Sequence, residues 1–158
     1  MTVEARSSTA DLDDARTKLV QSFATLDDAM LDEPGVVGDW SVRQALAHLL
    51  AWDAWGVRAL AALERGDDLA QPDDDQMNLT WYAKIRTVSG SELQRLLRTS
   101  RNDLVANLAA MSDEERSTPR YELGERLMSA DEFIDGFIEH DKEHASEIRA
   151  WRKSRGIC

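Results

Sequence analysis

The sequence has 158 residues, of which 42 % are hydrophobic and 31 % are charged, the balance of a folded globular domain rather than of a disordered chain. We expect a single domain over residues 1–158. The formal net charge is −11, and because binding to nucleic acid and to anionic membranes depends on Lys and Arg, we expect neither partner. No apolar run reaches the length of a membrane span, and no signal peptide is apparent, so the expected location is cytoplasmic.

The first predicted helix covers residues 9–31 and ends at the turn-forming sequence around Pro34 and Gly35. Its apolar residues recur at three- and four-residue steps, which is the spacing of one buried helix face. These residues are Leu12, Ala15, Leu19, Phe23, Leu26 and Met30.

The second predicted helix has the clearest start signal in the sequence. Ser41 and Gln44 match a capping box, and Trp40 stands where a hydrophobic staple residue would. The helix continues to about residue 65, where Gly66 can close its C-terminal end.

Residues 66–88 are predicted to begin with an acidic loop, and residues 77–85 to form either a short helix or the first turns of the next element. A capping box of Ser89 and Glu92 predicts the start of the third long helix, which we expect to end near Met111. A further short turn is expected after Ser112.

The last predicted helix begins with a third capping box, Ser129 and Glu132, and runs to about Ser154. The preceding stretch, around Pro119 and Gly124, is predicted as a loop, and we expect no strand anywhere in the chain. Four amphipathic helices of this length predict an all-α four-helix bundle. Cys158 is the last residue and only cysteine, so it cannot form an internal disulfide.

The three histidines of the chain all fall on predicted apolar faces. His140 and His144 are four residues apart, in the same stripe of the last helix as Phe137 and Ile148, so both rings should point into the bundle. His48 lies on the inner side of the second helix. Three converging neutral imidazoles can hold one divalent metal ion and leave coordination positions open. The alternative is that they are hydrogen-bonded core residues.

The spacing of the histidines excludes several other metal and catalytic sites. A ferritin-like di-iron centre needs Glu-x-x-His on two helices, and neither that pattern nor the HExxH of zinc proteases occurs in the chain. A GxSxG nucleophile elbow and a glycine-rich phosphate loop are also missing from the sequence. A mononuclear centre of His48, His140 and His144 is therefore the metal site that the residues predict.

Two segments resemble the DinB-like superfamily, whose members are small four-helix bundles. These segments are GDWSVRQALAHLLAWDAW (38–55) and FIDGFIEHDKEHASEIRAW (133–151), and Asn78 between them fits the same pattern. The superfamily includes thiol-dependent S-transferases, mycothiol-dependent maleylpyruvate isomerases and the ClbS/DfsB proteins. The resemblance implies an up-down-down-up bundle with a long connection between the second and third helices. It also implies that His48, His140 and His144 form a metal triad.

The function implied is an enzyme in which a bound divalent ion activates a low-molecular-weight thiol, or water, for attack on a small electrophilic molecule. Zinc and nickel are the first candidates for the ion, and iron is another. Such a protein would be a transferase, an isomerase or a hydrolase. The alternatives are a ClbS/DfsB-type protein that sequesters a small molecule without turnover, and a stress-related homodimer without chemistry.

Several further residues are candidates for roles around the metal. Four carboxylates near the histidines of the last helix could accept hydrogen bonds from the imidazole N–H groups, and Glu147 is the best placed by helical angle. The other three are Glu139, Asp141 and Glu143. Four aromatic residues either belong to the ordinary core of the bundle or, if the protein has a substrate pocket, form its walls: Trp52, Trp55, Phe137 and Trp151.

Overall fold

The computed structural model describes residues 9–67, 72–123 and 125–157, so Cys158 lies outside the described residues. Its seven helices are α1 (Thr9–Phe23), α2 (Asp28–Leu31), α3 (Val42–Glu64), α4 (Asp74–Ile85), α5 (Gly90–Ala109), α6 (Asp113–Ser117) and α7 (Ala130–Ser154). One short antiparallel hairpin is formed by β1 (Tyr121–Leu123) and β2 (Arg126–Met128).

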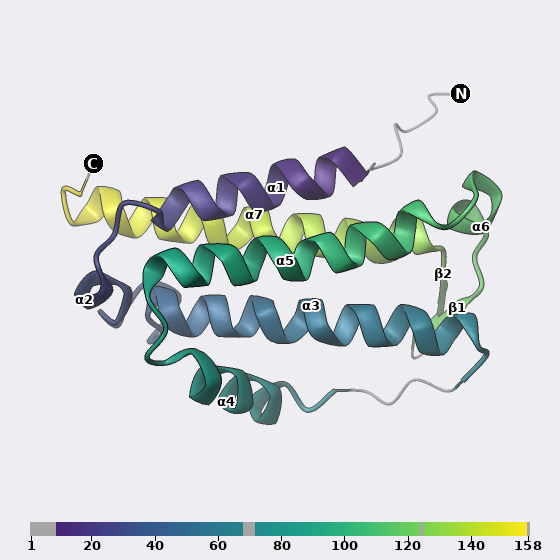
Figure 1. Ribbon diagram of the computed structural model, residues 1–158, viewed down its shortest axis with the longest axis horizontal. Coiled ribbons are helices and arrows are strands. Elements are labelled where there is room, and N and C mark those ends of the chain that lie inside the picture. The colour runs from purple at the N-terminus through teal and green to yellow at the C-terminus, as the bar shows by residue number, and fades with distance from the viewer. Residues whose placement is uncertain (1–8, 68–71, 124, 158) are drawn as a thin grey trace.

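Four long helices, α1, α3, α5 and α7, form the predicted bundle (Figure 1). In Figure 1, α1 and α7 run in one direction and α3 and α5 run in the other, which is the up-down-down-up topology that the resemblance implies. Each helix of the bundle contacts two others, in the cyclic order α1, α5, α3, α7. The long connection from α3 to α5 contains α4, which packs on α3.

The capping residues predicted from the sequence begin the helices observed. The side chains of Ser41 and Ser129 accept hydrogen bonds from the backbone N–H groups of Gln44 and Glu132, respectively. In each case the Gln44 or Glu132 side chain accepts a hydrogen bond from the backbone N–H of the capping serine. Ser89 also caps its helix, but Glu92 pairs with Arg95, so the predicted capping box is half formed. These caps satisfy backbone N–H groups that the first helical turn leaves without partners.

Two predictions about secondary structure are wrong. The helix expected over residues 9–31 is broken after Phe23, because Asp27 accepts from the backbone N–H of Met30 at 2.8 Å and starts the separate helix α2. The expected loop around Gly124 contains the β1–β2 hairpin. Strands of three residues are too short to produce a period-2 signal in the sequence.

The bundle interior consists of two apolar clusters with four charged side chains between them. On every long helix, one buried Arg or Asp separates the residues of the first cluster from those of the second. These residues are Arg16 on α1, Asp53 on α3, Arg101 on α5 and Asp141 on α7. Among the described residues, no helix is long and apolar enough to cross a membrane.

Candidate metal centre

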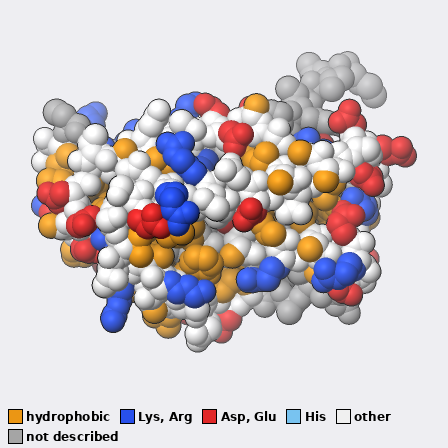
Figure 2. All heavy atoms as spheres, in the orientation of Figure 1, with side chains coloured by type: hydrophobic (Ala, Val, Ile, Leu, Met, Phe, Trp, Pro, Cys, Tyr) orange, Lys and Arg blue, Asp and Glu red, His pale blue; other side chains and the backbone are white. Residues whose placement is uncertain are grey.

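The three histidines meet where α3 faces α7. His48 comes from α3, and His140 and His144 come from successive turns of α7. One ring nitrogen of each lies within 4.8 Å of the corresponding nitrogen of the other two. The Nε2 atoms of His48 and His140 are 2.8 Å apart. None of the histidine atoms is visible on the face of the molecule shown in Figure 2, which agrees with a site between α3 and α7, behind α5.

Two hydrogen bonds determine the orientation and the tautomer of the His48 and His144 rings. The Nδ1–H of His48 donates to Oδ1 of Asn78 at 2.9 Å, and the Nδ1–H of His144 donates to Oε2 of Glu147 at 2.7 Å. Because a neutral imidazole carries one N–H, the Nε2 of both rings then holds a lone pair directed into the cluster. Such partners behind the ligands are typical of metal-binding histidines, since they set the tautomer and the ring orientation.

The position of Asn78 depends on how α4 is held against α3. Arg43, which is buried on the first turn of α3, donates to the backbone carbonyl oxygens of Ile85 and Val88 at the C-terminal end of α4. Its Nε also donates to Asp32 at 2.7 Å. One buried arginine thus fastens α4 where Asn78 can reach His48.

The donor set fits a divalent metal ion. The Nε2 of His144 is buried and has no hydrogen-bond partner among the described residues, a state that costs about 1–3 kcal/mol when nothing else satisfies the atom. Burial, followed by the neighbouring His144 and His48, lowers the pKa of His140 to about 3. Burial also lowers the pKa of His48. These two imidazoles are therefore neutral at pH 7, which is the form that binds metals.

A cavity of about 330 Å³ adjoins the histidines, a size within the usual range of ligand sites. His48 and His140 form one side of it, and the remaining walls are apolar: Trp52, Trp55, Phe133, Gly136 and Phe137. A Cβ at Gly136 would meet nothing within 4 Å, so an alanine would fit at this position. A Cβ at Gly56 would lie 2.5 Å from the Phe137 ring, so Gly56 lets that ring pack close to α3.

The structure bears out some of the predicted surroundings and contradicts others. Trp52, Trp55 and Phe137 line the cavity as expected, but Trp151 does not, because it lies about two turns beyond His144 in the other apolar cluster. Glu147 does accept from a histidine, although from His144 and not from His140.

The other three predicted carboxylate partners are not bound to histidines. Glu139 and Glu143 are exposed, and Glu139 pairs with Lys142. Asp141 is buried but points to a different side of α7, where it accepts from Arg16 and Arg101. Adjacent residues on a helix are about 100° apart, so His140 and Asp141 serve different clusters.

The four charged residues that join the bundle helices were not predicted from the sequence. Arg16 donates to both Asp53 and Asp141 at 2.8–2.9 Å, and Arg101 donates to Asp141 at 2.9 Å. The sequence does contain a sign of them, because each charged residue occupies a position in an otherwise apolar helical stripe. Arg101, for example, lies between Leu97 and Leu104 in the stripe of α5. Two cations and two anions in such stripes indicate a neutral buried network.

Comparison with known proteins shows which proteins share this fold. YfiT from Bacillus subtilis, described as a probable metal-dependent hydrolase with an unusual four-helix bundle topology, superposes with a TM-score of 0.76 at 20 % identity, covering 100 % of this chain and 94 % of YfiT. A mycothiol-dependent maleylpyruvate isomerase gives a TM-score of 0.72 at 14 % identity, covering 89 % and 58 % of the two chains. A search of curated proteins finds no match to the sequence.

A third similar structure corrects the expectation that nucleic acid is excluded as a partner. The colibactin self-resistance protein ClbS, solved in complex with a double-stranded DNA, has a TM-score of 0.75 at 13 % identity, covering 92 % of this chain and 93 % of ClbS. The expectation rested on net charge, which sums over the whole surface. Phosphate binding depends on the local arrangement of Lys and Arg, so a negative total does not exclude it.

The family is identified by the sequence. The model of the DinB superfamily matches residues 11–148, from the first turn of α1 to the turn of α7 that follows His144. This match includes all three histidines and their partners Asn78 and Glu147. The chain belongs to the DinB superfamily.

Proposed function

We propose that His48, His140 and His144 hold one divalent metal ion and that the protein uses it to act on a small electrophilic molecule. The observation that carries the proposal is the convergence of three imidazole nitrogens within 4.8 Å, one of them buried without a partner, beside an apolar cavity. A metal ion held there would lower the pKa of a coordinated thiol or water, so that the bound group is a nucleophile at neutral pH.

The residues around the histidines have distinct parts in this proposal. Asn78 and Glu147 hold two ligand rings in the orientation that directs Nε2 inward. Trp52, Trp55 and Phe133 provide flat apolar walls that bind a small organic molecule and exclude water from it. The reaction class supported by this arrangement is conjugation, isomerisation or hydrolysis of that molecule.

Two nucleophiles are supported by the comparisons. The description of the isomerase as mycothiol-dependent favours a low-molecular-weight thiol, whereas that of YfiT as a probable metal-dependent hydrolase favours water. A thiol co-substrate would place the protein in the cytoplasm, where thiols are kept reduced. Zinc and nickel remain the first candidates for the ion, with iron as another, because imidazole binds all three.

Elemental analysis of the purified protein tests the metal. We expect about one divalent ion per chain in the wild type and a near-complete loss in His140→Ala, because the variant lacks one of three ligands. Glu139→Ala is the matched control, since Glu139 is the exposed neighbour of His140 on α7. Wild-type protein without stoichiometric metal would remove the basis of the proposal.

Turnover tests the chemistry. The metal-loaded protein is incubated with a generic electrophile, such as a chlorodinitrobenzene, with and without each of several low-molecular-weight thiols. We expect product formation that depends on metal and is lost in His140→Ala. If protein shown to contain metal gave no turnover with any thiol or with water, the proposed catalytic activity would be refuted. The proposal that the histidines bind a metal ion would still stand.

A second candidate is a protein of the ClbS/DfsB type that sequesters a small molecule. Of the described residues that line the cavity, only His48 and His140 are ionisable, so the walls offer binding but no separate acid or base. Stoichiometric quenching of tryptophan fluorescence by an electrophile, without product release, would favour this candidate over the enzyme.

A further inference from the structure

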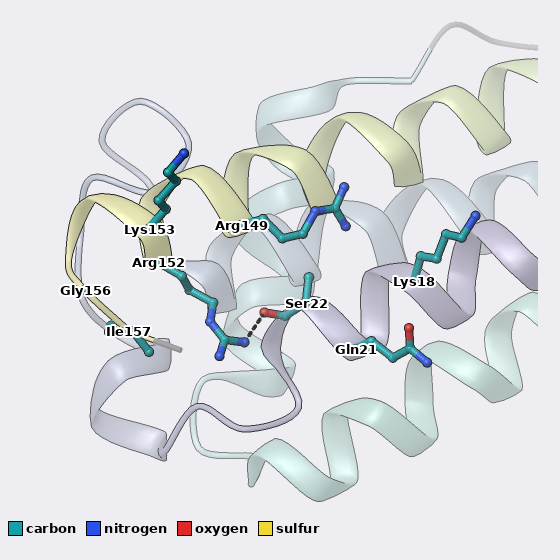
Figure 3. Close-up of a pocket in the computed structure, with 8 residues that line it drawn as sticks. All are labelled: Lys18, Gln21, Ser22, Arg149, Arg152, Lys153, Gly156 and Ile157. Atoms are coloured by element: carbon teal, nitrogen blue, oxygen red, sulfur yellow. Dashed lines mark hydrogen bonds between the residues drawn. The ribbon is translucent and has the colours of Figure 1, made fainter.

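A basic groove lies between α1 and the C-terminal end of α7, on a different side of α7 from the histidines. Its volume is about 540 Å³, within the range of small-ligand sites. Four of its eight lining residues are cations: Lys18, Arg149, Arg152 and Lys153. Figure 3 shows them on the two helices, together with the polar side chains of Gln21 and Ser22.

The helical spacing of these residues places them on one face of α1 and on one face of α7. Lys18, Gln21 and Ser22 stand at positions i, i+3 and i+4 of α1, and Arg149, Arg152 and Lys153 repeat that spacing on α7. Residues at these positions share one face of a helix. Because α1 and α7 pack side by side in the same direction, the two faces form the walls of one groove.

Two of the four cations in this groove are uncompensated among the described residues. Among the described residues, Arg149 and Lys153 are without any hydrogen bond or ion pair, and both are exposed. Lys18 pairs with Asp14 at 2.9 Å, but both side chains are about 60 % exposed, so the pair contributes little in water. A concentration of cations is unusual in a chain with a net charge of −11.

One of the four cations is held in place by the backbone. Arg152 crosses from α7 to α1 and donates to the carbonyl oxygen of Ser22 at 2.9 Å, as drawn in Figure 3, and to the hydroxyl of Thr25 at 2.9 Å. These bonds fix a guanidinium at the base of the groove, whereas Arg149 and Lys153 remain free to close on a ligand. A fixed cation flanked by adaptable ones suits an anion with several oxygen atoms.

We infer that this groove binds a phosphate-bearing ligand. The phosphate can belong to a free nucleotide or pyrophosphate, or to the phosphodiester backbone of a nucleic acid, because both present the same tetrahedral anion to Arg and Lys. The site is independent of the histidines, since α7 directs His140 and His144 towards α3 and Arg152 towards Ser22 of α1. It therefore extends the proposed function and does not depend on it.

The test is isothermal titration calorimetry with two probes, pyrophosphate and a 12-base-pair DNA duplex, at low ionic strength. The groove variant is R149Q/K153Q, which keeps Arg152 and its contacts with α1. The control variant is R58Q/R86Q, which removes two exposed arginines from α3 and from the end of α4. His140→Ala is titrated as well, so that any phosphate bound by a metal at the histidines is recognised.

We expect wild type, control and His140→Ala to bind at least one probe, and the groove variant to bind it at least tenfold more weakly. If the duplex is the ligand, the slope of log K against log salt concentration should also fall by about two in the groove variant, since two phosphate contacts are lost. Which probe binds more tightly identifies the source of the phosphate. No binding of either probe to wild type, or an equal loss in the control variant, would overturn the inference.

Discussion

The two polar clusters inside this bundle share helices α3 and α7 and differ in whether opposite charges are paired within them. Asp53 and Asp141 pair with Arg16 and Arg101, so that two positive and two negative charges neutralise one another in the interior. Both clusters contain buried atoms without a hydrogen-bond partner in the described residues: Nε and Nη1 of Arg101 in the network, and Nε2 of His144 among the histidines. The histidine cluster differs in that it holds three imidazoles and no opposite charge.

This difference separates a structural cluster from a candidate functional one. A neutral ionic network joining α1, α3, α5 and α7 holds the helices in one arrangement, because each buried charge in it has an opposite charge beside it. His48 and His140 line the cavity, and their Nε2 atoms lie 2.8 Å apart. Two nitrogens at that distance need a proton or a metal ion between them.

The largest effect is expected from breaking the ionic network. Asp141→Asn removes one of two buried anions and leaves Arg16 and Arg101 with a single charged partner, which should lower the free energy of unfolding by about 3–5 kcal/mol. Urea denaturation of metal-free protein measures this change. Asp135→Asn, at an exposed position of the same helix, should change stability by less than about 0.5 kcal/mol. Similar stabilities for the two variants would show that the network does not hold the bundle.

The histidine cluster should raise the free energy of unfolding only when a metal ion is bound to it. Zn²⁺ or Ni²⁺ at a hundred times its dissociation constant should raise the free energy of unfolding by about 2.7 kcal/mol, and a chelator should reverse the gain. Thermal denaturation with and without each ion measures it. His144→Ala should melt at one temperature in both conditions, whereas Glu143→Ala, altered at the exposed preceding residue, should respond like wild type. A wild-type melting temperature insensitive to both ions would contradict the proposed site.

A smaller loss of metal affinity is expected when a substitution disturbs only the orientation of one histidine ring. Glu147→Gln weakens the acceptor of the His144 Nδ1–H bond and should reduce metal affinity about tenfold to a hundredfold. Competition with a chromophoric chelator gives the affinity. Glu139→Gln, whose carboxylate is exposed and bonded to Lys142, should bind metal as wild type does. Equal affinities for the two variants would mean that Glu147 does not position the ligand.

A further effect, separate from metal binding, is a dependence of stability on pH in the metal-free protein. The pKa of His140 is about 3 in the folded state and near 6.5 in the unfolded chain, so the unfolded state binds more protons between these values. Its stabilising contribution is therefore complete above pH 6.5 and is lost as the pH falls towards 3. Urea midpoints measured from pH 7 to pH 4 should fall more steeply for wild type than for His140→Gln. Parallel profiles would show that His140 is not buried in its neutral form.

Local sequence signals predicted most of the fold because the forces that start and bury a helix act over a few residues. Ser41 and Ser129 cap the helices they were expected to cap, and the apolar stripes face the interior. Those signals did not show the break after Phe23, since the periodicity of the apolar residues continues across it. They also did not show the hairpin, whose three-residue strands are held by pairing across a turn.

The sequence by itself determined that three histidines would face inward, because the period of a helix places them on apolar stripes. Only the tertiary structure decided that they meet, since that depends on the distance and the relative height of α3 and α7. Tertiary structure also decided which neighbours each residue has. Glu147 reaches His144 and not His140, Asn78 arrives on a helix fixed by Arg43, and Asp141 turns away towards the arginines. A sequence pattern specifies which face of a helix a residue occupies, whereas packing specifies what lies opposite that face.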